Sequence, residues 1–502
     1  MKRLSGIIYL FLACLAVTTA TAQTMNVRVG KVTYAHAAKN TGDMPFATGS
    51  TLTVEGMVYT VGNATAVSTN VVDGIDIDDT VVKDSTVSVV YNGTSATVLV
   101  AGNIARYLTI TLDGAHVSIV QSEDLQKEVT YTLSGSSTNG SFFMDGSYKA
   151  SFVLDNLTLT NPSGIAVDIE DGKSIGITLS GTNTLTDGTG GSHNATLYVD
   201  GHAAFSGTGT LTLNGLTKHA FASDEHVVIN SGTIVVAQAA GDGFHINERF
   251  NMKGGTLTIQ AIGDGIDVGF RGVNKGTKDQ YERNGFLEFN GGTATVNTTG
   301  LATKALKADS TIVIANATVT ATTSGNAYYD TTAKDFSSAA AVKTGGAFMM
   351  SSGTLTALST GDGGKGINAT GVVNISGGKA CITTTGDLFE YGTDDTKPQG
   401  IKSDNSITIS GGEVYVCAGS YDGNATAFKP GTGFSFYING GTLMGIARKK
   451  TTVAGSSAQG SSNQSSTKVT GGETLTIKGV SYTIPSNYSI SKANVLVSTA
   501  GM

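Results

Sequence analysis

A short pattern recurs eight times between Val227 and Leu443 of this 502-residue chain: apolar, polar, apolar, two small turn residues, and then a second alternating run that usually starts with threonine. The eight turn dipeptides are Ser231-Gly232, Gly254-Gly255, Gly291-Gly292, Asn316-Ala317, Ser352-Gly353, Gly377-Gly378, Gly411-Gly412 and Gly440-Gly441. A repeat with a period of about 20 to 50 residues indicates an architecture in which each copy stacks on the previous one. It constrains the shape of the protein more than its chemistry.

The apolar positions of the repeat are kept in all eight copies, and alternation with a period of two is typical of strands that bury one face. Successive turns are separated by 23 to 37 residues. The pattern predicts an all-β fold, a single-stranded parallel β-helix, in which the longer intervals carry insertions. Phe250, Leu287 and Ile312 should then lie directly above one another. A flexible low-complexity segment is the alternative, but it would not keep such apolar columns.

Outward positions fit the same interpretation. Threonine follows the turn in six of the eight copies, and the two exceptions are Lys379 and Glu413 on adjacent coils. Opposite charges on neighbouring strands attract each other, so we expect these two side chains to pair.

Composition excludes several classes of protein. The chain has 67 glycines, no tryptophan and 14% charged residues, which is typical of β structure rather than of helices. Its formal net charge of −7 argues against nucleic acid as a partner. No basic amphipathic stretch suggests binding to a membrane surface.

The first residues have the features of a secretory signal peptide. Lys2-Arg3 precede an apolar run that ends near Val17, and Ala20-Thr21-Ala22 supplies a cleavage site. We expect cleavage near Ala22 and a location outside the cell, on its surface or in the periplasm. Lipidation of Cys14 is the alternative, with a poorer sequence match. No later segment is predicted to span a membrane.

Cleavage would leave two cysteines, Cys381 and Cys417, on neighbouring coils. Both are expected to face outward, with an offset of two residues along the strands. That offset places their Cα atoms beyond easy reach of a disulfide. The sequence therefore favours two reduced, half-exposed thiols.

Two segments, 177–187 (ITLSGTNTLTD) and 207–213 (GTGTLTL), precede coils that are joined by Gly-Asp-Gly corners. In this order they resemble the secreted bacterial carbohydrate-binding parallel β-helix proteins, which are similar in fold to pectate lyases. The resemblance covers roughly residues 84–450. It implies calcium at coil corners and affinity for plant cell-wall polysaccharides, including cellulose and acidic pectin.

The chain is then divided into a signal peptide, a β-rich N-terminal segment, the β-helix carbohydrate-binding domain, a flexible linker rich in Ser, Gly and Gln, and a short β segment. Their bounds are 1–22, 23–83, 84–447, 448–470 and 471–502. The strand pattern of residues 51–61 recurs at 474–484. These two segments could pair with each other or cap the two ends, and the sequence leaves both possibilities open.

Acidic residues recur at the corners after the second strand of each copy, and stacking would bring them into a column. Calcium binds six to eight oxygen atoms from carboxylates, carbonyls and water. The candidate calcium ligands are Asp242, Asp264, Asp267, Asp362 and Asp387. The alternative is that Asp-Gly is simply favourable turn chemistry.

A second column lies ten residues before each turn, and it contains His245, Asp267 and several lysines. Lys307, Lys343, Lys402 and Lys429 are its candidate ligand-binding residues. Stacked lysines repel one another, so each needs an acidic partner. Asp309 and Asp404 are candidates within the chain, and a polyanionic sugar is the candidate outside it. Ordinary solvated lysines are the alternative.

Aromatic side chains provide the remaining candidate contacts with a sugar. The tyrosines concerned lie in the insertions of the long coils, which are expected to form a wall beside the lysines; they are Tyr281, Tyr328, Tyr329 and Tyr391. Alternatively, these rings cover only the insertions' own apolar contacts.

The leading hypothesis is a secreted, noncatalytic protein that binds acidic plant-type or other cell-wall polysaccharides and is stabilised by calcium. One alternative is a calcium-dependent polysaccharide lyase, with Lys307 or Lys402 as the base that removes a proton. A surface adhesin or structural solenoid is the other. The seven histidines form no recognisable Ser-His-Asp arrangement. The oligomeric state is left open.

Overall fold

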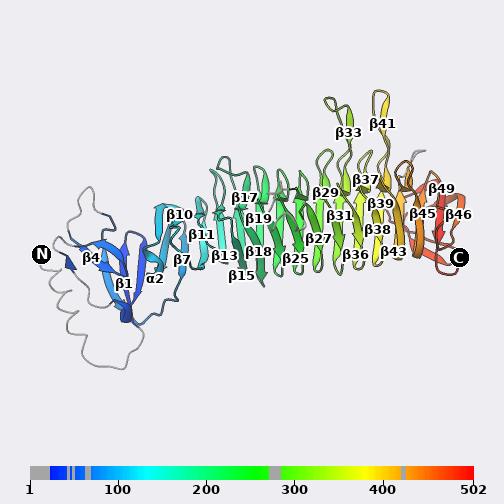
Figure 1. Cartoon of the computed structure of the whole chain (residues 1–502). Helices are drawn as coiled ribbons and strands as arrows, with labels where there is room; N and C mark the ends of the chain where they lie inside the picture. Colours follow the sequence, from blue (N-terminus) through cyan, green and yellow to red (C-terminus); the bar gives the residue numbers. More distant parts are fainter. Residues whose placement is uncertain (1–22, 42–45, 48–50, 63–68, 271–283, 420–424) are drawn as a thin grey trace.

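The computed structural model describes residues 23–41, 46–47, 51–62, 69–270, 284–419 and 425–502. Nearly all of its regular structure is β-strand. Within these residues, the helical elements are one 3₁₀ turn, η1 (Ala38–Asn40), and one short helix, α2 (Gly102–Ala105). The strands form an elongated stack, with the first described strands at one end and the last strands at the other (Figure 1). The prediction of an all-β protein is confirmed.

Two long sheets, with 27 and 13 strands among the described residues, run along the stack. Apart from the antiparallel pair β9–β10, the smaller sheet is parallel throughout. Its strands are β9 (Leu108–Asp113), β10 (Ala115–Gln121), β12 (Gly140–Asp145), β14 (Val167–Glu170), β17 (Ala195–Val199), β20 (His219–Ser223), β23 (Phe244–Ile246), β26 (Ile266–Val268), β29 (Lys304–Ala308), β34 (Ala340–Thr344), β37 (Lys365–Ala369), β42 (Gln399–Ser403) and β44 (Thr426–Lys429).

In the repeated region, each coil gives one strand to the smaller sheet and two to the larger sheet, except that the two are continuous as β43 and as β45 in the last two coils. The strands of the larger sheet there are β18 (His202–Gly207), β19 (Thr210–Gly215), β21 (His226–Ile229), β22 (Thr233–Ala239), β24 (Arg249–Met252), β25 (Thr256–Ala261), β27 (Phe286–Phe289), β28 (Thr293–Thr298), β30 (Ile312–Ile314), β31 (Thr318–Thr323), β35 (Phe348–Met350), β36 (Thr354–Ser359), β38 (Val373–Ile375), β39 (Lys379–Thr384), β43 (Ile407–Ala418) and β45 (Phe436–Ala447).

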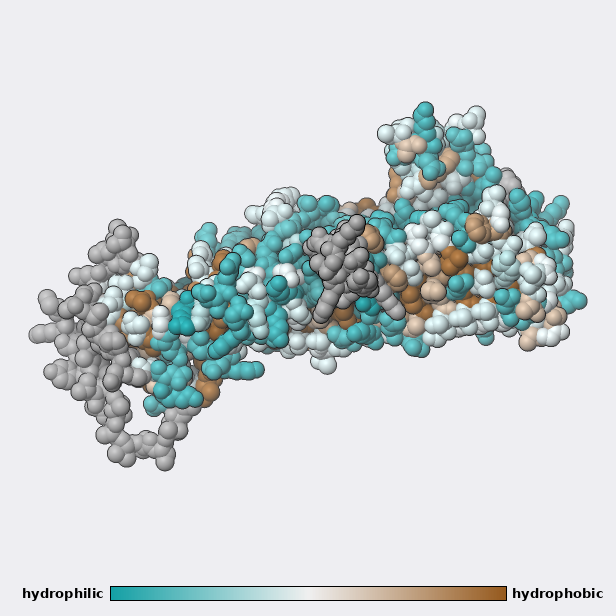
Figure 2. Space-filling view, in the orientation of Figure 1, coloured by the Kyte–Doolittle hydropathy of each residue, from teal (hydrophilic) through white to brown (hydrophobic). Residues whose placement is uncertain are grey.

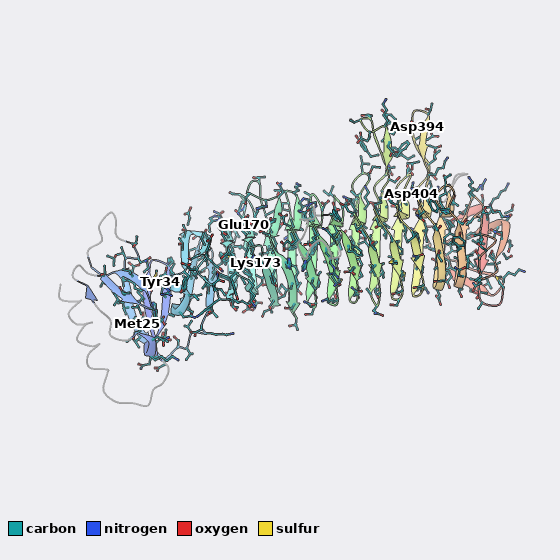
Figure 3. All side chains as sticks on the ribbon, viewed as in Figure 1. Met25, Tyr34, Glu170, Lys173, Asp394 and Asp404 are labelled. Carbon is teal, nitrogen blue, oxygen red and sulfur yellow. The ribbon has the colours of Figure 1, made fainter. Side chains whose placement is uncertain are left out.

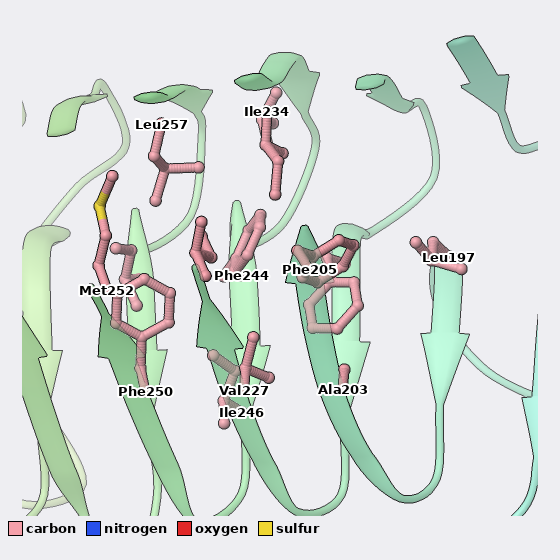
Figure 4. Close-up of a cluster of buried hydrophobic side chains, with 14 of the residues drawn as sticks. Leu197, Ala203, Phe205, Val227, Ile234, Phe244, Ile246, Phe250, Met252 and Leu257 are labelled. Atoms are coloured by element: carbon pink, nitrogen blue, oxygen red, sulfur yellow. The ribbon is translucent and has the colours of Figure 1, made fainter. Parts of the chain in front are cut away.

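The stacking predicted from the repeat is present in register. Phe250 pairs with Leu287, which in turn pairs with Ile312, and all three side chains are fully buried. Aromatic rings continue the packing between coils: the Phe250 ring centroid lies 6.2 Å from that of Phe244 and 5.8 Å from that of Phe289. Phe244 and Phe250 lie among other buried apolar side chains inside the stack (Figure 4). The expected pair outside the core also forms, with 3.5 Å between Lys379 Nζ and Glu413 Oε2.

The turn dipeptides meet a steric requirement of this packing. Gly255 has a φ of 78°, and a Cβ atom there would lie 2.5 Å from the carbonyl oxygen of Gly232 in the previous coil. Glycine avoids both the backbone strain and the clash. In the fourth copy, where Asn316-Ala317 replaces the glycines, Asn316 takes the positive φ, at 55°. Asparagine tolerates this conformation better than most residues.

The recurring end segments form matching hairpins. β4 (Thr51–Val54) pairs with β5 (Met57–Thr60), and β47 (Thr474–Ile477) pairs with β48 (Val480–Thr483). Both two-residue turns have positive φ throughout, and each ends in glycine. This is the hairpin turn that suits the twist of antiparallel strands. The two segments do not pair with each other, since each pairs within its own end of the stack.

The linker predicted over residues 448–470 is wrong in its second half. Strand β46 (Ser462–Val469) pairs antiparallel with β49 (Ile490–Ser498), and β49 pairs with β45. An uncovered sheet edge exposes unpaired backbone groups, and this C-terminal segment covers the edge at β45. A polar sequence therefore becomes a strand because it completes a ladder.

The same segment overturns the prediction of two half-exposed thiols. Cys417 is fully buried, because the C-terminal residues Tyr482 and Tyr488 cover the outer face of β43. Cys381 is partly exposed, and both cysteines are free, as expected. The offset of two residues is also confirmed, since Cys381 pairs with Tyr415 rather than with Cys417.

Truncating one buried aromatic ring should weaken the stack. Phe250→Ala removes a fully buried ring between coils, so we expect it to lower the free energy of unfolding by about 3–5 kcal/mol. Denaturant titration followed by circular dichroism measures the change. The matched control is Met349→Ala, at a side chain that is 43% exposed. Equal effects of the two substitutions would contradict the assignment of the core.

Candidate functional site

The outer face of the 13-stranded sheet carries a continuous line of side chains, which we call the charged column. Its members pair in register from coil to coil, and they are Ala222, His245, Asp267, Lys307, Lys343, Asn368, Lys402 and Lys429. The predicted column is therefore present. Lys307 and Lys343 are direct neighbours, as expected.

Lys307 is neutralised by the previous coil. Its Nζ lies 2.8 Å from Asp267 Oδ2 and 3.4 Å from Asp264 Oδ2. Burial alone would lower the pKa of Lys307, but the two carboxylates outweigh it and raise that pKa. The side chain thus stays protonated, which is unsuitable for a base. Asp309, the partner expected from the sequence, instead accepts a hydrogen bond from the backbone N–H of Phe270.

The other lysines of the charged column fall into two kinds. Lys402 Nζ lies 2.7 Å from Asp404 Oδ1, so this predicted pair is confirmed. Lys343 donates to the Thr370 hydroxyl, and Lys429 is exposed. Among the described residues, no carboxylate oxygen comes within 4.0 Å of the ammonium groups of Lys343 and Lys429. Burial, and then the charge of Lys402, lowers the pKa of Lys343.

Two hairpins project from the stack beside this column (Figures 1 and 2). One contains β32 (Tyr328–Asp330) and β33 (Asp335–Ser337), and the other contains β40 (Phe389–Tyr391) and β41 (Asp394–Thr396). Asp394 lies toward the outer end of its hairpin, well away from Asp404 on the stack (Figure 3). These two hairpins are insertions of the long coils, and they stand side by side as the expected wall requires. Tyr281 lies outside the described residues.

Aromatic rings hold the two hairpins together. Tyr329 stacks on Tyr391 with 4.2 Å between ring centroids, and Phe336 meets Tyr329 edge to face at 4.9 Å. Tyr329 is therefore occupied largely by contacts within the insertions. Tyr328 and Tyr391 keep about half of their surface exposed, at 48% and 49%. These two rings remain accessible to a ligand.

A buried lysine that the sequence analysis missed anchors the second hairpin. Lys365 Nζ donates to the carbonyl oxygens of Gly363 and Lys397, each at 2.6 Å, and to the Thr396 hydroxyl at 3.0 Å. Burial, and less strongly the charge of Lys402, lowers the pKa of Lys365 to about 7. The repeat gave no signal for Lys365, because lysine does not recur at this position. The residue that pairs with Lys365 in the previous coil is Ala340.

The predicted corner carboxylates form a ladder of backbone contacts. Asp242 Oδ1 accepts from the N–H of Asp264, and Asp264 Oδ1 accepts from the N–H of Lys304, both at 2.8 Å. Asp362 Oδ1 accepts from the N–H of Asp387 in the same way. With Asp267 paired to Lys307, four of the five proposed calcium ligands have a carboxylate oxygen in contact with a protein group. These contacts favour the turn-chemistry alternative at those positions.

Two histidines lie beside Asp242. Its Oδ2 lies 3.0 Å from His245 Nδ1 and 3.3 Å from His219 Nδ1. Burial alone would raise the pKa of Asp242, but the two imidazoles beside its carboxylate hold it well below the ordinary value. The hydrogen bond with Asp242 in turn raises the pKa of His245. The sequence analysis missed this cluster, although the 26-residue spacing of the two histidines is close to one coil.

A different corner holds buried side-chain oxygens that lack hydrogen-bond partners. Asp171, which follows Glu170 and precedes Lys173 by two (Figure 3), is fully buried, and neither of its carboxylate oxygens has a well-formed hydrogen bond. Gln121 Oε1 is likewise buried without a partner. A Cβ atom added to Gly146 would lie 3.0 Å from Asp171 Oδ2 and 3.1 Å from Gln121 Oε1, so both oxygens point to one spot. Hard oxygen donors of this kind suit calcium.

Nearby carboxylates add to the cost of the buried Asp171 charge. Burial raises the pKa of Asp171 to about 6, Lys173 opposes the rise, and the charges of Asp200 and Asp145 add to it. A bound cation would remove the cost of this buried negative charge. The sequence pattern had no means of singling out Asp171, since the cluster lies in the less regular coils before Val227.

Comparison with known proteins gives one family. The family model described as "carbohydrate-binding domain-containing protein" matches residues 113–388. Among solved structures, the polysaccharide lyase-like protein from C. thermocellum, in a gadolinium derivative, is 21% identical. That match covers 48% of this chain and 92% of the other, with a TM-score of 0.39. No curated protein matches. No helix in the described ranges is long and apolar enough to cross a membrane.

The buried carboxylate should make stability depend on pH when calcium is removed. The pKa of about 6 in the folded chain exceeds the ordinary aspartate value, so the folded state binds the proton more tightly than the unfolded state. Its stability then falls as the pH rises from about 4 to above 6, by on the order of 2–3 kcal/mol. In chelator, Asp171→Asn should therefore unfold at a higher temperature than the parent chain at pH 8, but not at pH 4.

Thermal unfolding at both pH values measures this difference. Asp124→Asn, at an exposed aspartate, is the matched control and should show no such dependence. A gain for Asp171→Asn that is the same at both pH values would contradict the assignment.

Proposed function

This chain belongs to the family of carbohydrate-binding domain-containing proteins, and from that premise we propose that it is a secreted, noncatalytic protein that binds acidic polysaccharides. The matched residues 113–388 include most of the charged column and the first hairpin. The signal peptide and the location outside the cell remain predictions from residues 1–22, which lie outside the described ranges.

One observation carries the proposal: two lysines with no carboxylate partner among the described residues lie on the charged column beside exposed tyrosines. On the charged column, Lys343 pairs directly with Asn368 and Lys429 pairs directly with Lys402, with neighbouring strands about 4.8 Å apart. Anionic groups repeated along a polymer would neutralise them. Tyr328 and Tyr391 offer flat apolar faces on which sugar rings can pack.

We also propose that the coils form a single-stranded parallel β-helix, as the repeat predicted. The in-register parallel pairing along both long sheets supports this arrangement. A polymer could then contact several coils at once, because each coil presents its charged-column residue on the same face.

The state of the two candidate bases supports binding without catalysis. A lyase base must accept a proton from the sugar. Lys307 is held protonated by Asp264 and Asp267, and Lys402 is paired with Asp404. The structural-solenoid alternative predicts no affinity for any glycan, so the experiment below also tests it.

Calcium is proposed at the Asp171 corner, where Asp171 and Gln121 would supply oxygen ligands and Asp145 and Asp200 further negative charge. When bound, the ion would neutralise buried carboxylate and tie neighbouring coils together. This role is structural, and the ion lies apart from the proposed sugar-binding lysines.

Reversing the two unpartnered charges should weaken binding to an acidic polymer. We expect the double variant Lys343→Glu/Lys429→Glu to bind polygalacturonate at least about tenfold more weakly than the parent chain, and binding of the parent to weaken as salt is added. Affinity electrophoresis in gels containing polygalacturonate, with cellulose as the neutral comparison, measures both effects.

The matched control is Lys468→Glu/Lys492→Glu, which changes two exposed lysines of the C-terminal segment. It should leave binding unchanged. Retention of the parent chain by neither polymer, or equal loss in the two double variants, would refute the proposed site.

Calcium should raise the unfolding temperature of the parent chain. A ligand that binds only the folded state stabilises it by about 2.7 kcal/mol at 100 times its Kd. Asp171→Asn should abolish most of this increase without changing retention by polygalacturonate at low salt. Differential scanning calorimetry with calcium and with chelator measures the effect. The same unfolding temperature of the parent chain under both conditions would contradict the proposed calcium site.

A further inference from the structure

Five of the seven histidines lie within residues 193–245, and each has a carboxylate beside it. Two of them meet at the corner where the chain leaves the 13-stranded sheet and enters the larger sheet. We call this group the histidine–glutamate corner, and its members are His202, Glu225, His226 and Glu248. It is separate from the charged column and from the Asp171 cluster.

Coil stacking creates the group from residues that are distant in sequence. His202 and His226 precede the paired residues Ala203 and Val227, so the two imidazoles stand one above the other. Their ring centroids are 3.5 Å apart, and the ring planes are inclined by 41°. The 24-residue interval between them is one coil.

Carboxylates of the following coils approach both rings. His202 Nε2 contacts Glu225, and His226 Nδ1 lies 3.8 Å from Glu248 Oε2. One donor atom from each of His202, His226 and Glu248 lies within 4.8 Å of the other two. The Glu248 side chain is only 6% exposed, so its charge is largely withdrawn from water at a distance too long for a hydrogen bond to His226.

We propose that this corner binds a divalent cation of the zinc class, with His202, His226 and Glu248 as ligands. Imidazole nitrogen suits zinc and its neighbours, whereas calcium prefers an all-oxygen site. Tetrahedral zinc needs donor atoms about 3.4 Å apart, which the partly exposed histidines can reach by small rotations. Glu225, in contact with the His202 ring, holds that ring in orientation, as carboxylates commonly do for metal-bound histidine.

The other two histidine clusters are less suited to a metal. His219 Nδ1 accepts a hydrogen bond from the N–H of Asp242 at 3.1 Å, and Asp242 Oδ1 is used by Asp264. In the third cluster, His193 Nε2 lies 2.6 Å from Glu170 and its ring stacks on Tyr198 at 3.7 Å. In both, the close contacts join residues that would share the metal, whereas the close contact of His202 Nε2 is with Glu225, which is not one of the three proposed ligands.

Titration of the full chain with zinc tests the proposal. After removal of metals with a chelator, the protein is titrated with zinc chloride by isothermal titration calorimetry in excess calcium, and cobalt is used as a spectroscopic probe of tetrahedral coordination. We expect one tight site in the parent chain. His202→Gln/His226→Gln should lose at least about 100-fold in zinc affinity, and Glu248→Gln about tenfold or more.

The matched control is His219→Gln/His245→Gln, which changes two other stacked histidines and should retain the tight site. Circular dichroism and unfolding temperature of each variant in chelator show whether it is folded, and Glu248→Gln keeps both imidazoles in case the double variant is not. No zinc binding by the parent chain, or the same affinity in the control and His202→Gln/His226→Gln variants, would overturn the proposal. Neither result depends on whether the chain binds polysaccharide.

Discussion

The backbone register between successive coils is the constraint on which the rest of this structure depends. Parallel ladders fix each coil at one strand spacing from the next, so every side chain faces the equivalent position of its neighbour. Close approach at the corners demands glycine: a Cβ atom at Gly361 would lie 1.9 Å from the carbonyl oxygen of Gly325, and one at Gly386 would lie 2.0 Å from that of Gly361. Packing and the placement of charge both follow from this register.

Inside the stack the register gives a continuous apolar core, and outside it gives columns of charge. The same rule that places Leu287 on Phe250 places Lys307 on Asp267. In a column, a like-charged neighbour is unfavourable and an opposite charge is favourable, so the columns resolve into paired and unpaired residues. Unpaired positions such as Lys343, together with buried carboxylates such as Asp171, are where the chain's own charges do not balance. Those are the places at which external ions and ligands are expected to act.

The repeat predicted the core positions and the members of the charged column, because the period of two and the spacing of the turns leave few alternatives. It was less successful where one segment folds over another. Cys417 was expected to be half-exposed, but the C-terminal strands cover it, and residues 462–469 form a strand rather than a linker. Both errors arise from the C-terminal segment, which lies outside the eight-copy repeat. The repeat therefore carried no information about where this segment packs.

The sequence by itself determined which repeat positions form the core of the stack and which residues share a column, since these depend on alternation and coil length alone. Only the tertiary structure decided what each charged side chain contacts. Lys307 bonds to the previous coil rather than to Asp309, and the Asp242 corner holds histidines where the pattern suggested calcium. His202 and His226 meet for the same reason. Contacts of this kind depend on side-chain direction and on distances across coils of unequal length, and neither is encoded in the spacing of a repeat.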